Sequence, residues 1–172
     1  NPNERLAIET SHPQWLVDRW VESYGYEDTA EMLRENNIPP VQTVRVNTTK
    51  ATVENVLTTL EREGVKAVRS EVMPECVHLQ TGQAARTAAF KHGLITIQDE
   101  SSMLPANVLN PQPGMKVLDM CAAPGGKTTH MAEKMQNEGS ILAMDLHPKK
   151  LDLIDENTAR LGLEIVQTAP ID

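Results

Sequence analysis

The feature that most constrains the fold is the regular alternation of strand-like and helix-like segments over the last eighty residues. Short apolar runs bounded by glycine, proline or polar residues predict strands at 95–98, 115–120, 140–144 and 164–167. Between them, helical patterns predict helices at 101–109, 127–135 and 148–161. Strands that are joined by single helices pair in parallel through right-handed crossovers. We therefore expect an α/β fold with a Rossmann-like half sheet over 93–172.

Shorter elements precede this half sheet. Alternation at 44–47 and apolar runs at 65–68 and 77–79 predict strands, and a capped pattern over 52–63 predicts a helix. These elements define a small α+β module over 41–92. Residues 1–40 form a helical linker region, in which Trp15, Trp20 and Tyr24 share one helix face that we expect to be core.

Composition excludes several classes of protein. No window approaches 18 uninterrupted apolar residues, so we expect no membrane-spanning helix, and no secretion signal is visible. The net charge of −8 argues against a general nucleic-acid-binding protein, although acids are absent between Glu75 and Asp99. Cys76 and Cys121 have neither metal-binding nor disulfide spacing. We expect a monomeric cytoplasmic protein without a metal, and the missing initiator Met indicates a piece of something longer.

The loop over 121–126 carries the functional signal. It follows a buried strand and opens a helix, and it is built of small residues that let the backbone approach a ligand. Free N–H groups at the start of the helix would face that ligand. The loop lies where ligands bind in parallel sheets, beyond the carboxyl ends of the strands.

Three ligands are candidates for this loop. Gly126, Lys127 and Thr128 match the end of a P-loop, but Cys121 stands where that motif needs its first glycine, and Pro124 lacks an N–H. A dinucleotide site would need G-x-G-x-x-G, which is absent. S-adenosylmethionine is the favoured ligand.

Two acids support this choice. S-adenosylmethionine needs an acid on its ribose hydroxyls, and Asp145 ends the next strand, 24 residues after Cys121. Asp172 follows the third strand, where an adenine or ribose edge would lie. A simpler role for Asp145, as the cap of the helix that begins at Pro148, is compatible with ribose binding.

Four segments resemble the NSUN/RsmB (Sun, Fmu) family of RNA 5-methylcytosine methyltransferases. Residues 119–130 (DMCAAPGGKTTH) resemble its first cofactor motif, residues 96–103 (TIQDESSM) the motif before it, and residues 45–47 (RVN) its RNA-side signature. Residues 9–16 (ETSHPQWL) are similar to the bacterial RsmB branch. The resemblance spans nearly the whole chain, and it implies methylation of C5 of a cytosine in 16S ribosomal RNA with S-adenosyl-L-methionine as the methyl donor.

The resemblance also implies roles for particular residues. Asp145 would contact the ribose and Asp172 the adenine, and Lys150 is a further candidate contact. The residues expected to line the cofactor from the loop are Cys121, Ala122, Ala123, Pro124, Gly125, Gly126 and Lys127. The residues expected beside the RNA are Arg45, Asn47, Gln98 and Asp99.

The chain also departs from the family pattern. The family uses a Pro-Cys pair and a Thr-Cys pair, one cysteine to attack C6 of cytosine and one to release the product, and neither pair occurs here. We therefore assign the nucleophile to neither Cys76 nor Cys121, and we assign no catalytic residue in this chain. Asp172 follows Pro-Ile, where the family often has Gly-Asp, and the helical RNA-binding domain that precedes the RsmB catalytic core is missing. Two alternatives remain open: a non-catalytic RNA-binding module and a P-loop nucleotide-binding protein.

Overall fold

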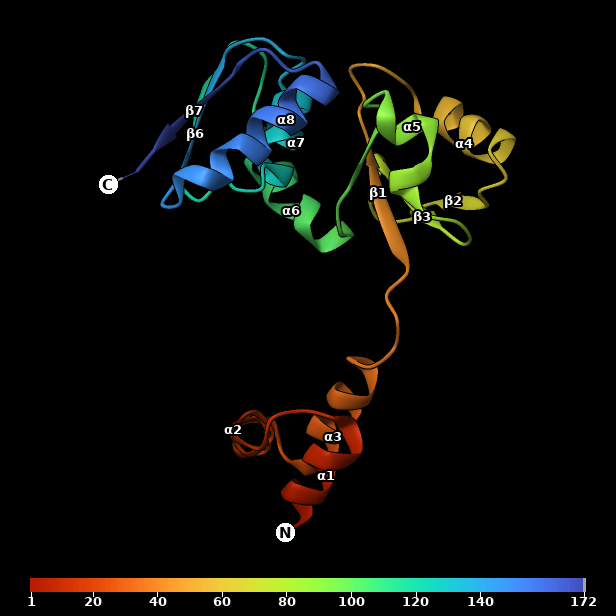
Figure 1. The fold of residues 1–172 in the computed structure, drawn as a ribbon, viewed down its shortest axis with the longest axis vertical. Helices are drawn as coiled ribbons and strands as arrows, with labels where there is room; N and C mark the ends of the chain where they lie inside the picture. The colour runs from red at the N-terminus through yellow and green to blue at the C-terminus, as the bar shows by residue number, and fades with distance from the viewer. Residues whose placement is uncertain (172) are drawn as a thin grey trace. The chain divides into compact units, whose positions relative to one another are not determined.

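The structure is a computed structural model that describes residues 1–171. Its contacts divide the chain into two compact units, Asn1–Pro40 and Val41–Asp172, and each unit is described by itself (Figure 1).

The first unit contains three helices, α1 (Pro2–Thr10), α2 (Gln14–Tyr24) and α3 (Tyr26–Glu35). Its core consists of small and aliphatic side chains: Leu6, Ala7, Val17, Ala30 and Leu33. Trp15 is 62% exposed and Tyr24 is 57% exposed, while Trp20 packs partly against the core. The expectation that the aromatic stripe is core was therefore wrong for Trp15 and Tyr24, because aliphatic residues on the neighbouring face fill the interior.

The second unit begins with an antiparallel sheet in the order β2-β3-β1-β4. Its strands are β1 (Gln42–Val46), β2 (Ala67–Arg69), β3 (Cys76–Leu79) and β4 (Ile95–Ile97). The helices of this part are α4 (Val53–Arg62), α5 (Ala88–Lys91) and the short η1 (Ala84–Arg86). Because β4 pairs with β1, the strand expected at 95–98 lies in this sheet and not in the parallel one.

The two faces of the antiparallel sheet differ in character. One face presents Val44, Val77 and Ile95 to a core that also contains Val56 and Leu60 of α4. The register places polar side chains on the other face, since Thr43 lies opposite His78, and Arg45 lies opposite Cys76 and Thr96. The helix α6 (Glu100–Leu109) contacts β1.

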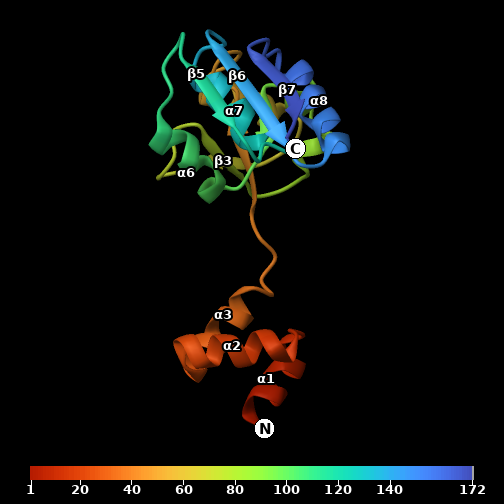
Figure 2. The same ribbon diagram turned by 90° about the vertical axis from the view of Figure 1, so that its left-hand side faces the viewer.

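The remaining strands form a parallel sheet in the order β5-β6-β7. The strands are β5 (Lys116–Asp119), β6 (Ser140–Asp145) and β7 (Val166–Pro170). The connecting helices are α7 (Gly126–Lys134), the short η2 (Pro148–Lys150) and α8 (Leu151–Leu161). The strands lie side by side in front of α7 in Figure 2. The expected α/β fold, with a small α+β module before a parallel half sheet, is confirmed.

The parallel sheet buries one face more than the other. Ile141 and Ala143 of β6 are buried among side chains of α7 and α8, including Met131 and Ile154. Leu142, which points the opposite way, is 39% exposed. Among residues 1–171, no helix combines the length and apolar character needed to cross a membrane.

Candidate functional site

The loop between β5 and α7 is held by hydrogen bonds at both of its ends. The Ala122 amide donates to the Met144 carbonyl at 2.9 Å, which ties the loop to β6. The Thr128 hydroxyl donates to Asp119 Oδ2 at 2.7 Å, which ties the first turn of α7 to the end of β5. Within the loop, the Gly125 amide donates to the Ala122 carbonyl at 2.7 Å. The backbone is thus fixed before any ligand arrives.

Gly125 is required by this loop for two reasons. Its φ is +99°, a left-handed conformation that side chains disfavour. A Cβ built on it would also lie 3.3 Å from Ile154 Cα, so the loop crosses α8 closely. A larger residue here would displace the loop from α8.

The first turn of α7 offers free donors. Among residues 1–171, the backbone amides of Gly126, Lys127 and Thr128 donate to no acceptor, and no side chain caps the helix. The N-terminus of a helix carries a partial positive charge, and its amides favour anions or other acceptors. This arrangement matches the sequence prediction of open amides at the loop.

Asp145 lies at the end of β6 and faces the loop. Its Oδ2 accepts a hydrogen bond from the Ala123 amide at 3.1 Å, and its Oδ1 accepts one from the His147 amide at 3.1 Å. These two bonds, that from His147 first, lower the pKa of Asp145, with a smaller contribution from the charge of Lys150. Each carboxylate oxygen keeps a second lone pair for a further donor. The bond from the His147 amide also shows that Asp145 orders the turn before α8. The two roles predicted for Asp145, ordering the start of this helix and binding a ribose, are therefore compatible.

A pocket of about 250 Å³ opens beside the loop. Its walls combine the loop with the segment between β4 and α6: Ile97, Gln98, Asp99, Ser102, Cys121, Ala122, Ala123, Pro124, Gly126 and Lys127. Gln98 is held in place, since its Nε2 donates to the Ser102 carbonyl at 3.0 Å. Gln98 and Asp99, expected on the RNA side, therefore share a pocket with the predicted cofactor loop.

Arg45 is fully buried and links β1 to α7. Its Nε and Nη2 each donate to the Glu133 carboxylate at 2.8 Å, and Nη2 also donates to Thr129 Oγ1 at 3.0 Å. Its Nη1 donates to the Gly126 carbonyl at 2.8 Å and to Gln98 Oε1. Every N–H of the guanidinium is directed at an acceptor within the protein, so Arg45 holds the loop from behind. This geometry gives no support to the expected role of Arg45 beside RNA.

Asn47 is also fully buried. Its Nδ2 donates to the carbonyls of Gly93 and Leu161, both at 3.1 Å, and its Oδ1 accepts from the amide of Thr49 at 3.1 Å. Asn47 thus joins the antiparallel sheet to the end of α8, and its expected RNA-side role gains no support from this placement.

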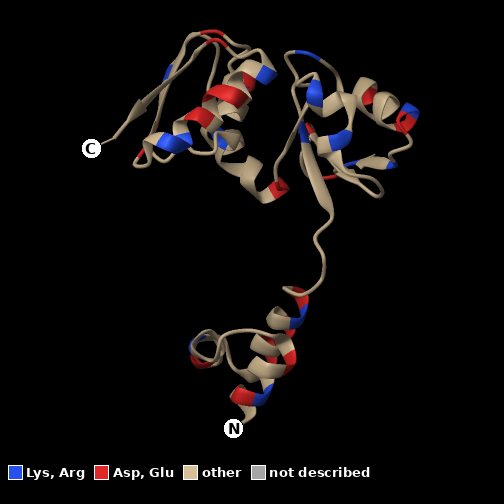
Figure 3. Ribbon diagram, in the orientation of Figure 1, with Lys and Arg blue, Asp and Glu red and all other residues tan. Residues whose placement is uncertain are grey.

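The remaining predicted residues fall in three settings. Lys150 is exposed, and Figure 3 shows the lysines that precede α8 followed by acidic residues along it. Cys121 is exposed in the loop, whereas Cys76 is buried. Burial and the nearby Glu100 raise the pKa of the Cys76 thiol to about 12, so it is protonated and a poor nucleophile. Asp172 lies outside the described residues.

Sequence reasoning missed the residues that support the site from behind. Glu133 is buried one helical turn after Thr129, and it neutralises Arg45. His130, also buried, donates from Nε2 to Glu75 Oε1 at 2.9 Å, and this bond lowers the pKa of Glu75 to about 2. The sequence did contain a signal for Glu133 and His130, because both interrupt the apolar stripe of α7. Charged and titratable residues must find partners when they are buried.

Solved structures with the same architecture define the class. The crystal structure of PH0851 is 37% identical, with a TM-score of 0.90, and the match covers 98% of this chain and 38% of that one. A methyltransferase homolog protein from Pyrococcus horikoshii is 32% identical, with a TM-score of 0.84, over 96% of this chain and 54% of that one. With the glycine loop and the acid after the next strand, the chain falls in the class of Rossmann-like methyltransferases.

The family follows from the sequence comparisons. Residues 12–86 match the RsmF/B-like methyltransferase ferredoxin-like domain, and residues 106–172 match the 16S rRNA methyltransferase RsmB/F family. The probable ribosomal RNA small subunit methyltransferase B of Bacillus subtilis (strain 168) is 45% identical over 172 residues. That match covers 100% of this chain and 38% of the relative, so the chain spans well under half of the relative's length. The chain belongs to the RsmB/F methyltransferase family.

Proposed function

We propose that this chain forms the S-adenosylmethionine-binding part of a cytoplasmic methyltransferase that modifies C5 of a cytosine in 16S ribosomal RNA. The relatives named as ribosomal RNA small subunit methyltransferases support the substrate class. The observation that carries the cofactor assignment is Asp145, whose carboxylate accepts from the Ala123 amide in the loop that leads to the open amides of α7.

The residues present fit this cofactor by charge and by their hydrogen-bonding groups. Ionised Asp145 has lone pairs for the two hydroxyls of a ribose, and the free amides of Gly126 and Lys127 suit the carboxylate of the methionine part. The small side chains of Ala122 and Ala123 leave room for a ligand against the backbone. S-adenosylmethionine supplies an electrophilic methyl group when bound.

This chain's own residues would bind and orient rather than react. Neither the Pro-Cys nor the Thr-Cys pair occurs among the 172 residues, and the Cys76 thiol is buried and protonated. We therefore assign the nucleophile and the product-releasing cysteine to parts of the protein outside this chain. We propose that Gln98 and Asp99, which line the same pocket as the loop, contact the target base.

Calorimetry on this chain tests the cofactor assignment. We expect S-adenosylmethionine to bind, and Asp145→Asn to weaken binding by roughly tenfold or more, since a hydrogen bond to a charged group contributes ~1.5–3 kcal/mol. Asp152→Asn is the matched control, because Asp152 is an exposed acid in the first turn of α8 and loses the same charge. Equal affinity of the two variants, or tight binding of ATP with magnesium in place of S-adenosylmethionine, would refute the assignment.

A further inference from the structure

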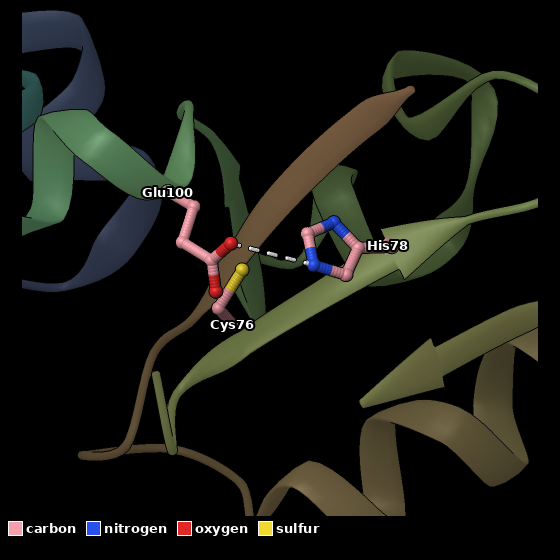
Figure 4. A group of neighbouring side chains, drawn as sticks. All are labelled: Cys76, His78 and Glu100. Carbon is pink, nitrogen blue, oxygen red and sulfur yellow. Dashed lines mark ion pairs between the residues drawn. The ribbon is translucent and has the colours of Figure 1, made fainter. Parts of the chain in front are cut away.

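Three potential metal ligands meet on the polar face of the antiparallel sheet. Cys76 and His78 are two residues apart on β3, so their side chains project from the same face. Glu100 lies in the first turn of α6, and its carboxylate points toward these two side chains (Figure 4). One ligand atom from each residue lies within 4.8 Å of the others. The cluster joins residues whose spacing in sequence gave no metal prediction.

The hydrogen bonds of His78 leave one ring nitrogen free for a ligand. Its Nδ1 lies 3.2 Å from Thr43 Oγ1, and the Thr43 hydroxyl itself donates to the Val41 carbonyl at 3.2 Å. With the hydroxyl proton on the Val41 carbonyl, Nδ1 carries the proton of the His78–Thr43 bond, and this is the tautomer that a metal would select. The Nε2 lone pair of neutral His78 then points at Glu100 Oε2, 3.6 Å away.

A hydrogen bond from Ser70 orients the Glu100 carboxylate. Ser70 Oγ accepts from the amides of Val72 and Met73, at 2.9 and 3.0 Å, so its hydroxyl proton is directed at Glu100 Oε1. Oε2 of Glu100 is left facing the His78 Nε2. Two acceptors that face each other repel, so either a proton or a cation must lie between them. Outer hydrogen bonds that fix a histidine tautomer and a carboxylate are typical of metal sites.

We propose that Cys76 Sγ, His78 Nε2 and Glu100 Oε2 bind a divalent transition metal, with zinc as the preferred ion. A thiolate, an imidazole and a carboxylate form a donor set that zinc accepts in tetrahedral geometry, and it excludes calcium and magnesium, which prefer oxygen ligands alone. Binding releases the thiol proton of Cys76 to solvent as the Sγ–metal bond forms. His78 and Glu100 also line a pocket of about 540 Å³, which would give water access to a bound metal.

The metal would have a structural consequence for the neighbouring pocket. It would tie the first turn of α6 to β3, and Asp99, just before Glu100, lines both this pocket and the one at the cofactor loop. Zinc binding at the cluster would not require the cofactor.

Zinc uptake by the purified chain tests the proposal. After equilibrium dialysis against zinc, elemental analysis should find one zinc per chain, and His78→Gln and Glu100→Gln should each weaken binding by roughly tenfold or more. His92→Gln is the matched control, because His92 is exposed and outside the cluster.

Cobalt gives a second readout that identifies the thiolate. The cobalt-loaded chain should show tetrahedral ligand-field bands and a thiolate charge-transfer band that Cys76→Ser abolishes and Cys121→Ser retains, since Cys121 is the exposed cysteine. If Cys76→Ser does not fold, the two partly exposed ligands His78 and Glu100 still decide the question. Substoichiometric zinc in the unaltered chain, or equal uptake in the His78, Glu100 and His92 variants, would overturn the proposal and leave a plain ion pair.

Discussion

The buried pair of Arg45 and Glu133 should dominate the stability of the second unit. The side chains are 0% and 2% exposed, and two bonds of 2.8 Å join them. Removing one partner of such a pair leaves an uncompensated charge in the interior, which costs about 3–5 kcal/mol. We therefore expect Arg45→Met and Glu133→Met each to lower the free energy of unfolding by about 3 kcal/mol or more. For a domain of marginal stability, this is a large fraction of the total.

The double variant separates charge from packing. Arg45→Met combined with Glu133→Met removes both charges together, so its loss of stability should be smaller than the sum of the two single losses by roughly 2 kcal/mol. The exposed pair of Arg69 and Glu54 supplies the control, and Arg69→Met should leave the unfolding midpoint unchanged within error.

Urea unfolding provides the assay and an internal reference. Both tryptophans, Trp15 and Trp20, lie in the first forty residues, so their fluorescence reports on the first unit alone. Circular dichroism reports on both units, and only its transition should move in the Arg45 and Glu133 variants. Single variants with losses below about 1 kcal/mol, or strict additivity in the double variant, would refute the argument that this pair is buried and coupled.

Two further results are expected. Gly125→Ala should lower the free energy of unfolding by about 1–2 kcal/mol or more in urea titrations, and it should weaken cofactor binding. Gly114→Ala is the control, because Gly114 also has a positive φ but has open space around it, so only the backbone strain should lower its stability. Equal effects of the two substitutions would contradict the close contact of Gly125 with Ile154. Because the pKa of Glu75 falls from 4.5 to about 2 on folding, its bond with His130 stabilises the protein above pH 4.5, and this contribution is lost as the pH falls through about 2. Unfolding followed against pH should show this acid slope in the unaltered chain, and Glu75→Gln should flatten it; a slope that the variant keeps would contradict the bond.

The sequence predicted those parts of the fold that depend on local pattern. The strand–loop–helix segment around Gly125 is contiguous, and the period of each element is visible within a short window, so the parallel sheet could be predicted and is confirmed. Asp145 could be placed because the carboxyl ends of neighbouring parallel strands meet at one edge of the sheet.

Long-range pairing explains what the sequence could not predict. Arg45 and Glu133 are 88 positions apart, and nothing near Arg45 indicates that its strand packs against α7 rather than facing solvent. The pairing of β4 with β1 depends on a register that spans about fifty residues, so the strand at 95–97 could not be assigned to the correct sheet from its own pattern. The Cys76 and Glu100 contact arises for the same reason, from two elements that meet only in the folded chain.

A crystal structure of this chain with S-adenosylhomocysteine would show whether Asp145 binds the ribose of the cofactor. We expect the ribose hydroxyls within hydrogen-bond distance of the Asp145 carboxylate and the amino-acid carboxylate at the first amides of α7. A nucleoside bound elsewhere, or an Asp145 carboxylate turned away from it, would contradict the account.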